Sequence, residues 1–236
     1  SAASDVYKRQ VCVFCDSRKT DGIRFRYGGG ICRECDRILP RTDWNGSFDG
    51  GFCVPYVLAP TFYTEPMRSA IMRYKFEDWS CCEDVFVHLM LEYIKNYPHL
   101  KDFDAVVPVP ISRQRLMERG FNQSVPLSKA IAKYFGILHS ENMLVKIRHT
   151  QRQSRLSAQQ RAENVKDAYA ARPDLVKNKR IILVDDIYTT GITMNECAKT
   201  LKNAGAAEVI GVSLSIVYKR EKDLMYRYKE AVLGKN

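Results

Sequence analysis

The sequence predicts an α/β protein in which a mostly parallel sheet is flanked by helices, with a small cysteine-containing module in front of it. Apolar, β-branched runs of strand length alternate along the chain with segments whose apolar residues recur at helical spacing. This alternation predicts the main domain. Paired cysteines near the N-terminus predict the separate module. The 236 residues, of which 45% are hydrophobic, suffice for one full-sized domain and one small one.

Composition favours an anionic partner. The chain has 37 Lys and Arg against 27 Asp and Glu, a formal net charge of +10, which favours nucleic acid or phosphorylated small molecules without choosing between them. No apolar run reaches the roughly 20 residues that cross a bilayer, and no signal-peptide pattern occurs. We therefore expect a soluble, cytoplasmic protein without membrane insertion.

The first ten residues, "SAASDVYKRQ", show no apolar pattern. Their second part, "DVYKRQ", is the translation of a transposon end used in sequencing libraries. We expect residues 1–10 to be non-native sequence and the natural start to be missing, so the fold prediction begins at Val11.

Residues 11–55 are predicted to form a zinc ribbon. Two Cys-x-x-Cys pairs, 16 residues apart, can present four sulfurs tetrahedrally to one Zn²⁺, and four protein ligands make the site structural. The predicted ligands are Cys12, Cys15, Cys32 and Cys35. Two disulfides are the alternative, which requires an oxidising compartment. A strand and glycine turn in "IRFRYGGG" complete the module, whose small core needs the metal. Cys53, Cys81, Cys82 and Cys197 lack paired spacing and are predicted to be buried or incidental thiols.

Residues 56–236 are predicted to form the main domain. Apolar residues at helical spacing, with Pro66 suited to a first turn, predict helices over residues 65–77 and 83–97. A β-branched run that ends at prolines predicts a buried strand over 104–110. A helix ended by Gly136 follows, and residues 142–148 are compatible with another strand.

The alternation continues in the second half of the chain. Residues 148–164 are polar and predict a long mobile loop that leads into a helix. Residues 180–186 are the clearest strand, 193–205 predict a helix, and 208–217 predict a further buried strand. The charged residues 218–232 predict a terminal helix.

Residues 181–193, "IILVDDIYTTGIT", run from this clearest strand through two acids into a short bend. At the carboxyl end of a parallel strand, just before a helix, backbone N–H groups and the helix dipole favour a phosphate. Thr189, Thr190 and Thr193 add hydroxyl donors, and Gly191 lets the backbone approach an anion closely. The bend is therefore a predicted phosphate site.

The two acids predict the rest of the ligand. Carboxylates aimed at a phosphate would repel it, so Asp185 and Asp186 are expected to bind the hydroxyls of an attached sugar. The implied ligand is a ribose 5-phosphate. Burial of these acids in an ion pair, or an orientation away from any cavity at the strand's end, would contradict this assignment.

The thirteen residues resemble the 5-phosphoribosyl 1-diphosphate (PRPP) signature of type I phosphoribosyltransferases: four apolar residues, two acids, three variable positions and Thr-Gly-x-Thr. The P-loop and G-x-G-x-x-G motifs are absent. "VVPVPIS", "ERGFNQS", "RHTQRQSRLSAQQRAEN" and the cysteine ribbon in front of them resemble, in this order, the ComF family of competence-associated proteins over residues 11–217. The resemblance implies the type I phosphoribosyltransferase fold.

The resemblance also implies site residues and a second metal. In type I enzymes the loop after the first core strand, here Val109 to Arg113, wraps the pyrophosphate, and Mg²⁺ bridges pyrophosphate and ribose. Asp185 and Asp186 are the implied catalytic acids. The predicted PRPP-binding residues are Ser112, Arg113, Asp185, Asp186, Thr189, Thr190, Gly191, Ile192 and Thr193.

The prolines of this loop allow two interpretations. Related enzymes often have a strained cis peptide here, and a proline at Pro108 or Pro110 would lower its cost from about 3 to below about 1 kcal/mol. The alternative is that these prolines only end the strand.

Arginines cluster in "RQRLMERGFNQS" and "RHTQRQSRLSAQQR". Arginine suits bidentate phosphate contact. The second segment is interpreted as a lid that closes over PRPP, or as a track for single-stranded DNA with Phe121, Tyr74 or Tyr134 for base stacking, and a solvated polar face is the third alternative. The candidate nucleic-acid-binding residues are Arg115, Arg119, Arg148, Arg152, Arg155 and Arg161.

Two functions fit these residues. The first is a ComF-family protein that binds PRPP and Mg²⁺ and acts in DNA uptake during natural transformation through single-stranded DNA, with a DNA-uptake helicase or another competence protein as partner. The alternative is an active phosphoribosyltransferase of nucleotide metabolism, a pentosyl glycosyltransferase with an unidentified acceptor. Purine-salvage relatives have a carboxylate where this chain has Thr189, so a purine acceptor loses support and no general base is identified.

Overall fold

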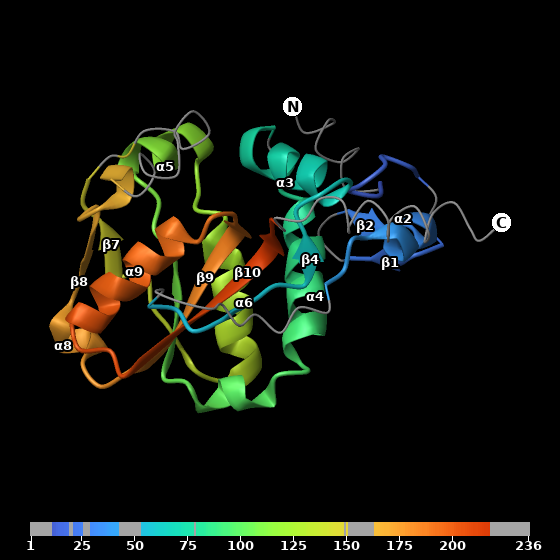
Figure 1. The fold of residues 1–236 in the computed structure, drawn as a ribbon. Helices are drawn as coiled ribbons and strands as arrows, with labels where there is room; N and C mark the ends of the chain where they lie inside the picture. The colour runs from blue at the N-terminus through green and yellow to red at the C-terminus, as the bar shows by residue number, and fades with distance from the viewer. Residues whose placement is uncertain are drawn as a thin grey trace.

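The main body of the protein is a six-stranded sheet between two layers of helices (Figure 1). The computed structural model describes residues 11–18, 21–25, 29–42, 53–77, 79–148, 150 and 163–217. The strand order is β3-β10-β9-β5-β6, β4 also pairs with β10, and every one of these pairs is parallel. The predicted fold class, a mostly parallel sheet flanked by helices, is confirmed.

Three strands at the centre of the sheet are the ones that the apolar runs predicted: β5 (Ala105–Pro108), β9 (Arg180–Tyr188) and β10 (Glu208–Ile216). Side chains of a strand alternate between its faces. Ile182 and Val184 of β9 accordingly pack in one hydrophobic cluster, and Ile181 and Leu183 in the other. The shorter strands β3 (Val57–Leu58), β4 (Thr61–Phe62) and β6 (Leu138–His139) were not predicted.

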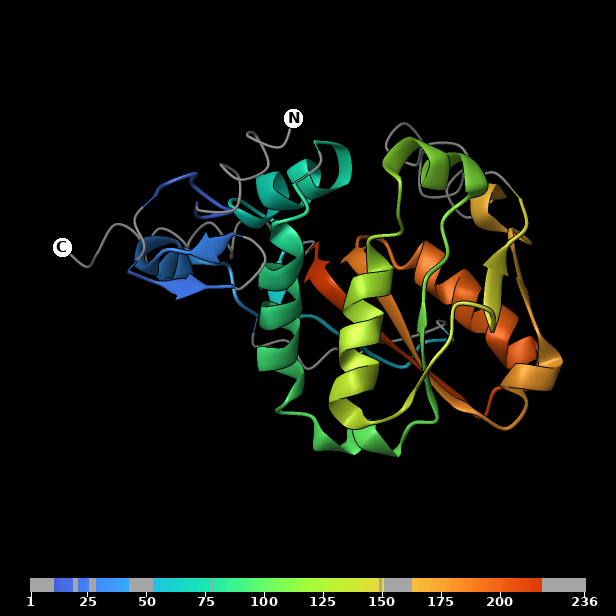
Figure 2. The same cartoon turned by 180° about the vertical axis from the view of Figure 1, so that it is seen from behind.

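Helices cover both faces of the sheet. On one face lie α4 (Cys82–Ile94) and α6 (Ser124–Phe135), seen in front in Figure 2. On the other lie α8 (Pro173–Val176) and α9 (Ile192–Asn203). The 3₁₀-helix η1 (Pro98–Asp102) joins α4 to β5. The predicted stop of α6 is confirmed, because Gly136 caps it with a φ of 69°.

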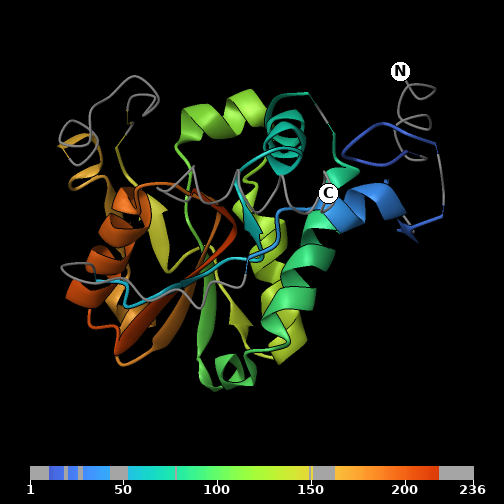
Figure 3. The same cartoon turned by 45° about the vertical axis from the view of Figure 1, so that its right-hand side comes forward.

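Two helices lie at the carboxyl end of the sheet: α3 (Met67–Phe76) and α5 (Arg113–Arg119) (Figure 3). They touch, because the guanidinium carbon of Arg119 lies 5.0 Å from the centre of the Phe76 ring. This places two helices that are far apart in the sequence over the end of β9.

A separate two-stranded antiparallel sheet is formed by β7 (Leu144–Lys146) and β8 (Tyr169–Ala171). The predicted strand within residues 142–148 is confirmed, but it pairs antiparallel with β8 and lies outside the main sheet. Most of the predicted loop at 148–164 and the predicted helix at 218–232 lie outside the described residues.

The N-terminal module consists of the antiparallel pair β1 (Ile23–Arg24) and β2 (Gly30–Ile31) followed by α2 (Arg33–Ile38), and it lies beside α4 (Figure 1). Its Val13 and Leu39 belong to the same hydrophobic cluster as Ile71 of α3 and Phe86 of α4. The module therefore packs into the core of its neighbours, and the domain boundary between residues 55 and 56 stays a prediction. Within the described ranges, no helix has both the length and the apolar character needed to cross a bilayer.

Candidate functional site

A cavity of about 220 Å³ lies at the carboxyl end of β9, where parallel α/β sheets bind their ligands. The PRPP-like signature contributes one part of its wall: Asp185, Asp186, Thr189, Gly191 and Thr193. Other segments contribute Lys75, Pro110, Arg115, Arg119, Ser124, Lys146 and Tyr169. Thr190 and Ile192 are not part of this wall, so most but not all of the predicted signature residues come together here.

The turn after β9 opens the N-terminus of α9 toward the cavity. Gly191 has a φ of 76° and is the residue from which the helix begins. A Cβ atom added to Gly191 would lie 2.1 Å from the hydroxyl oxygen of Tyr188. Both conditions require glycine at this position. A helix N-terminus at a cavity wall favours an anion through its backbone N–H groups and its dipole.

Asp185 lies between hydrogen-bond donors at the cavity wall. Its Oδ1 accepts from the Ser124 hydroxyl at 3.3 Å and from the backbone N–H of Asp186 at 2.8 Å. Burial, and then the charge of Asp186, raise the pKa of Asp185 to about 7. Near neutral pH this carboxyl group can therefore either donate or accept a hydrogen bond.

Asp186 forms an ion pair with a helix outside the signature. Its Oδ2 lies 2.5 Å from Nζ of Lys75 in α3, and the two side chains are 14% and 11% exposed. An ion pair is one of the two arrangements that would contradict the sugar-binding assignment, and it applies to Asp186. The second arrangement, in which the acids point away from the cavity, does not occur, because Asp185 and Asp186 both line the cavity wall. The assignment of the acids stays a prediction.

Cationic side chains form another part of the wall. Nζ of Lys146 donates to the hydroxyl oxygens of Thr150 at 2.9 Å and of Tyr169 at 3.3 Å. Burial, and then the charge of Arg115, lower the pKa of Lys146 to about 8. Arg119 donates to Oε1 of Gln123 at 2.9 Å. A wall with these three cations suits a ligand with several negative charges.

The loop after β5 borders the cavity through Val109, Pro110 and Ile111. Ser112 instead caps α5, where its hydroxyl oxygen accepts from the N–H of Arg115 at 3.4 Å, and Arg113 is exposed. Neither belongs to the cavity wall. Their predicted contact with pyrophosphate stays a prediction.

The first interpretation of the loop prolines, that Pro108 or Pro110 allows a cis peptide, is wrong. Among the described residues the cis bond is Glu65–Pro66, and the bonds before Pro108 and Pro110 are trans. Val109 donates its N–H to the carbonyl of Val184 at 2.8 Å, next to the pair of Pro108 with Val184 at which β5 ends. The alternative interpretation, that the prolines end the strand, is the one that fits.

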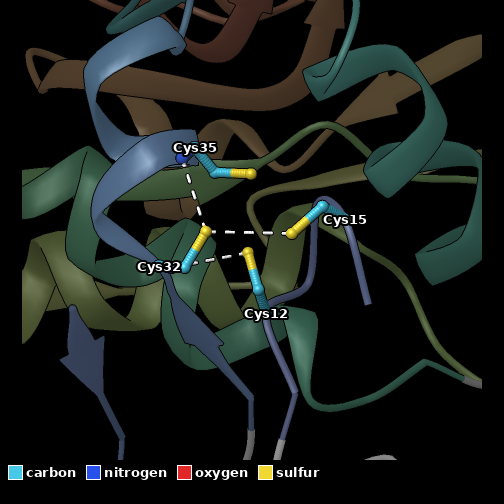
Figure 4. A group of neighbouring side chains, drawn as sticks. All are labelled: Cys12, Cys15, Cys32 and Cys35. Carbon is cyan, nitrogen blue, oxygen red and sulfur yellow. Dashed lines mark hydrogen bonds between the residues drawn. The ribbon is translucent and has the colours of Figure 1, made fainter. Parts of the chain in front are cut away.

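The four predicted zinc ligands converge at the module (Figure 4). Their sulfur atoms all lie within 4.8 Å of one another, and Sγ of Cys15 lies 3.7 Å from Sγ of Cys32. A tetrahedron with Zn–S bonds of about 2.3 Å has edges of about 3.8 Å. The N–H of Cys32 donates to Cys12 Sγ and that of Cys35 to Cys32 Sγ, both at 3.4 Å. The cluster can therefore hold a metal ion such as zinc.

The remaining cysteines give no sign of a second metal cluster in the described ranges. Cys81, Cys82 and Cys197 are buried and Cys53 is partly buried. Burial raises the pKa of Cys197, which keeps it a neutral thiol. The prediction that these are buried or incidental thiols is consistent with these positions.

The candidate nucleic-acid residues are divided among several places. Arg115 and Arg119 line the cavity. Arg148 is exposed, and its guanidinium donates to the carbonyls of Asn164 at 3.2 Å and Lys166 at 2.6 Å. Arg152, Arg155 and Arg161 lie outside the described residues.

The aromatic residues proposed for base stacking differ in exposure. Tyr74 was wrongly proposed, because only 4% of it is exposed and its ring packs edge-on against Phe86 and Phe121 in the core. Phe121 is itself partly buried against this core. Tyr134 is 51% exposed and can stack on a base.

Sequence reasoning missed several residues of the wall, among them Lys75, Ser124, Lys146 and Tyr169. Lys75 occurs in an ordinary amphipathic helix and Lys146 in a short strand. No motif or spacing in the sequence distinguishes either lysine from the other lysines of the chain. Their place in the wall depends on which elements the fold brings together.

A family model described as "Phosphoribosyl transferase domain" matches residues 122–233. Together with the parallel sheet and the cavity at the end of β9, the match places the chain in the class of proteins built on this domain.

Similar proteins with names indicate which family within this class the chain resembles. Competence protein F of Haemophilus influenzae is 33% identical over 152 residues, which are 62% of this chain and 66% of that protein. Competence protein ComFC of Streptococcus pneumoniae is 33% identical over 155 residues, 64% of each chain. DNA utilization protein YhgH of Escherichia coli K12 is 32% identical over 151 residues, 62% and 66% of the chains. The chain belongs to the ComF family, and its matched part spans just under two thirds of the length of these relatives.

Solved structures match part of the chain. Glutamine PRPP amidotransferase of B. subtilis, complexed with ADP and GMP, matches with a TM-score of 0.39 and 21% identity, over 60% of this chain and 30% of that one. Adenine phosphoribosyltransferase of Thermoanaerobacter pseudethanolicus matches with a TM-score of 0.37 and 14% identity, over 61% and 84%.

Proposed function

We propose that the protein binds PRPP with Mg²⁺ in the cavity at the end of β9 and acts in DNA uptake through single-stranded DNA. The observation that carries the first part is the composition of one cavity wall: two adjacent acids, a helix-opening turn that requires glycine, and four cationic side chains. The relatives named for competence and DNA utilization support the second part.

Each group of the proposed ligand has a matching part of the wall. The backbone N–H groups after Gly191 and the hydroxyls of Thr189 and Thr193 would hold the 5-phosphate. Asp185 and Asp186 would bind the ribose hydroxyls. Arg115, Arg119 and Lys146 would meet the pyrophosphate. Mg²⁺, when bound with PRPP, would neutralise part of the charge on the leaving pyrophosphate.

Thermal unfolding tests the site. Mg²⁺ and PRPP together are expected to raise the Tm of the unmutated protein, because a ligand that binds only the folded state stabilises it. The variant with Asp185→Asn and Asp186→Asn is expected to lose this rise. Asp174→Asn, an exposed acid paired with Arg172 and absent from the cavity wall, is the control and keeps the rise. No rise in the unmutated protein would refute the site.

A salt titration tests the DNA function. Affinity for a single-stranded oligonucleotide is expected to fall steeply as salt rises, because contacts between arginine and phosphate release counterions. Tyr134→Ala is expected to weaken binding if the exposed ring stacks on a base. Affinity that does not respond to salt would count against this function. A DNA-uptake helicase or another competence protein as partner belongs to the same proposal.

The alternative is that the domain is an active phosphoribosyltransferase. Lys146 favours it, because a lysine with a pKa of about 8 at the cavity wall can accept a proton near neutral pH. Catalysis would depend on holding PRPP and acceptor in place and on stabilising the departing pyrophosphate. Pyrophosphate release, measured against a panel of bases and nucleic acids, tests it, and release with none of them would leave the binding function alone.

A further inference from the structure

Helix α3 brings a lysine into the cavity that no motif assigns. Lys75 lies in the last turn of α3, outside residues 122–233 that the family model matches. Its Nζ lies 2.5 Å from Oδ2 of Asp186. Removing an ammonium group from water to this degree, with 11% of the side chain exposed, is unfavourable unless nearby negative charge offsets the loss of hydration.

Tyr74, the residue before Lys75, anchors the end of α3 in the core. It is 4% exposed, and its ring centre lies 5.4 Å from that of Phe86 and 5.1 Å from that of Phe121. Its hydroxyl donates to Oε2 of Glu83 at 3.1 Å. The rotation of the helix about its axis is therefore determined at this turn.

Arg73 anchors the same turn to the cysteine module. Its guanidinium donates to the backbone carbonyls of Val13 and Phe14, which lie between Cys12 and Cys15 in the chain, and pairs with Asp16 at 2.5 Å. Successive helix residues point about 100° apart. With residue 73 directed to the module and residue 74 to the core, residue 75 is directed to the cavity.

The two adjacent acids make the cavity electrostatically unfavourable for an anionic ligand, and Lys75 lies beside one of them. A sugar with several phosphate charges must bind beside two adjacent carboxyl groups, and repulsion between like charges is strong where water is partly excluded. We propose that Lys75 is the counter-ion of the site: a positioning residue whose ammonium cancels the charge of Asp186, so that an anionic sugar phosphate can bind beside both acids. This inference rests on the proposed binding of PRPP.

Calorimetry of the full chain with PRPP and Mg²⁺ tests the inference. Lys75→Met keeps the length of the side chain and removes its charge, and it is expected to bind PRPP roughly 10- to 100-fold more weakly. Lys75→Arg is expected to restore most of the affinity. The matched control is Lys179→Met, which removes a lysine 3.5 Å from Asp104 and outside the cavity wall, and it is expected to bind as the unmutated protein does.

A double-mutant cycle separates a charge effect from a general structural one. If Lys75 acts by cancelling the charge of Asp186, then Lys75→Met has little further effect on affinity in an Asp186→Asn background. The inference would be overturned if the losses of PRPP affinity in Lys75→Met and Asp186→Asn were additive. It would also be overturned if Lys75→Met bound PRPP as tightly as the unmutated protein or more tightly. The proposed function would stand in each of these cases. Absence of binding by the unmutated protein would overturn the proposed function itself. Unfolding of each ligand-free variant is measured alongside, and Lys75→Gln replaces Lys75→Met if the latter does not fold.

Discussion

Asp185 and Asp186 are adjacent in the sequence but differ in their surroundings. Asp186 has the ammonium of Lys75 beside it, whereas Asp185 accepts hydrogen bonds from a serine hydroxyl and a backbone N–H. Burial, and then the charge of Asp186, raise the pKa of Asp185. The two acids therefore differ: Asp186 is held in an ion pair, whereas Asp185 titrates near neutral pH.

This difference predicts how stability depends on pH. The pKa of Asp185 is raised from 3.8 to about 7, so its contribution to the free energy of unfolding is complete at low pH and is lost as pH rises through 7. Asp185→Asn cannot ionise. Between about pH 4 and about pH 7 the stability of this variant should therefore rise relative to that of the unmutated protein.

Urea unfolding of both proteins across this range measures the difference. Asp174→Asn is the control, because Arg172 lowers the pKa of Asp174, and no gain of the same sign is expected. Parallel pH profiles for Asp185→Asn and the unmutated protein would show that Asp185 titrates normally in the fold.

At the scale of single elements, the turn from β9 into α9 depends on one glycine. Gly191→Ala places a methyl group against the Tyr188 hydroxyl and also strains a backbone with positive φ. Gly136→Ala is a matched control, since its φ is 69° and nothing lies within 4 Å of the added Cβ. The control is expected to lose only the strain energy, about 1 kcal/mol.

Gly191→Ala is expected to lose more stability than the control and also the rise in Tm with Mg²⁺ and PRPP. The reason is that the clash moves the turn whose N–H groups form the proposed phosphate site. Thermal unfolding with and without the ligand measures both effects. A normal rise in Tm for Gly191→Ala would place the phosphate elsewhere.

At the scale of the whole molecule, the cysteine module and the sheet are connected through α3. They share a hydrophobic cluster, and Arg73 links the first pair of cysteines to the turn that carries Lys75. A metal ion held by the four cysteines would fix the carbonyls that Arg73 binds, since metal and folding are coupled in such small modules. The module would then act on the cavity without contributing a residue to its wall.

Removing the metal tests this connection. A chelator selective for zinc over Mg²⁺, with Mg²⁺ in excess, is expected to lower the Tm of the full chain and to weaken PRPP binding several-fold, which calorimetry measures. The variant with Cys12→Ser and Cys15→Ser is expected to behave in the same way without chelator. An unchanged PRPP affinity in the metal-free protein would show that the module and the cavity are independent.

Much of the architecture was predictable from local sequence. Strand periodicity and positive φ are local properties of the chain. The apolar runs that form β5 and β9 could therefore be predicted, and so could the helix stop at Gly136 and the turn around Gly191. Two Cys-x-x-Cys pairs likewise predicted a cluster that the fold assembles. The two-residue strands β3 and β4 are too short to show any periodicity, and β10 recruits them through pairing alone.

What the sequence alone determined about this protein is its class of fold, its four-cysteine cluster and the segment around which the candidate site forms. The tertiary structure decided which other side chains reach that segment. Lys75 lies 111 residues before Asp186 in the chain, and Tyr74, proposed from sequence as a stacking surface, is buried beside it. The physical reason is that burial and ion pairing depend on neighbours that only the packing of α3 against the sheet and the module brings together.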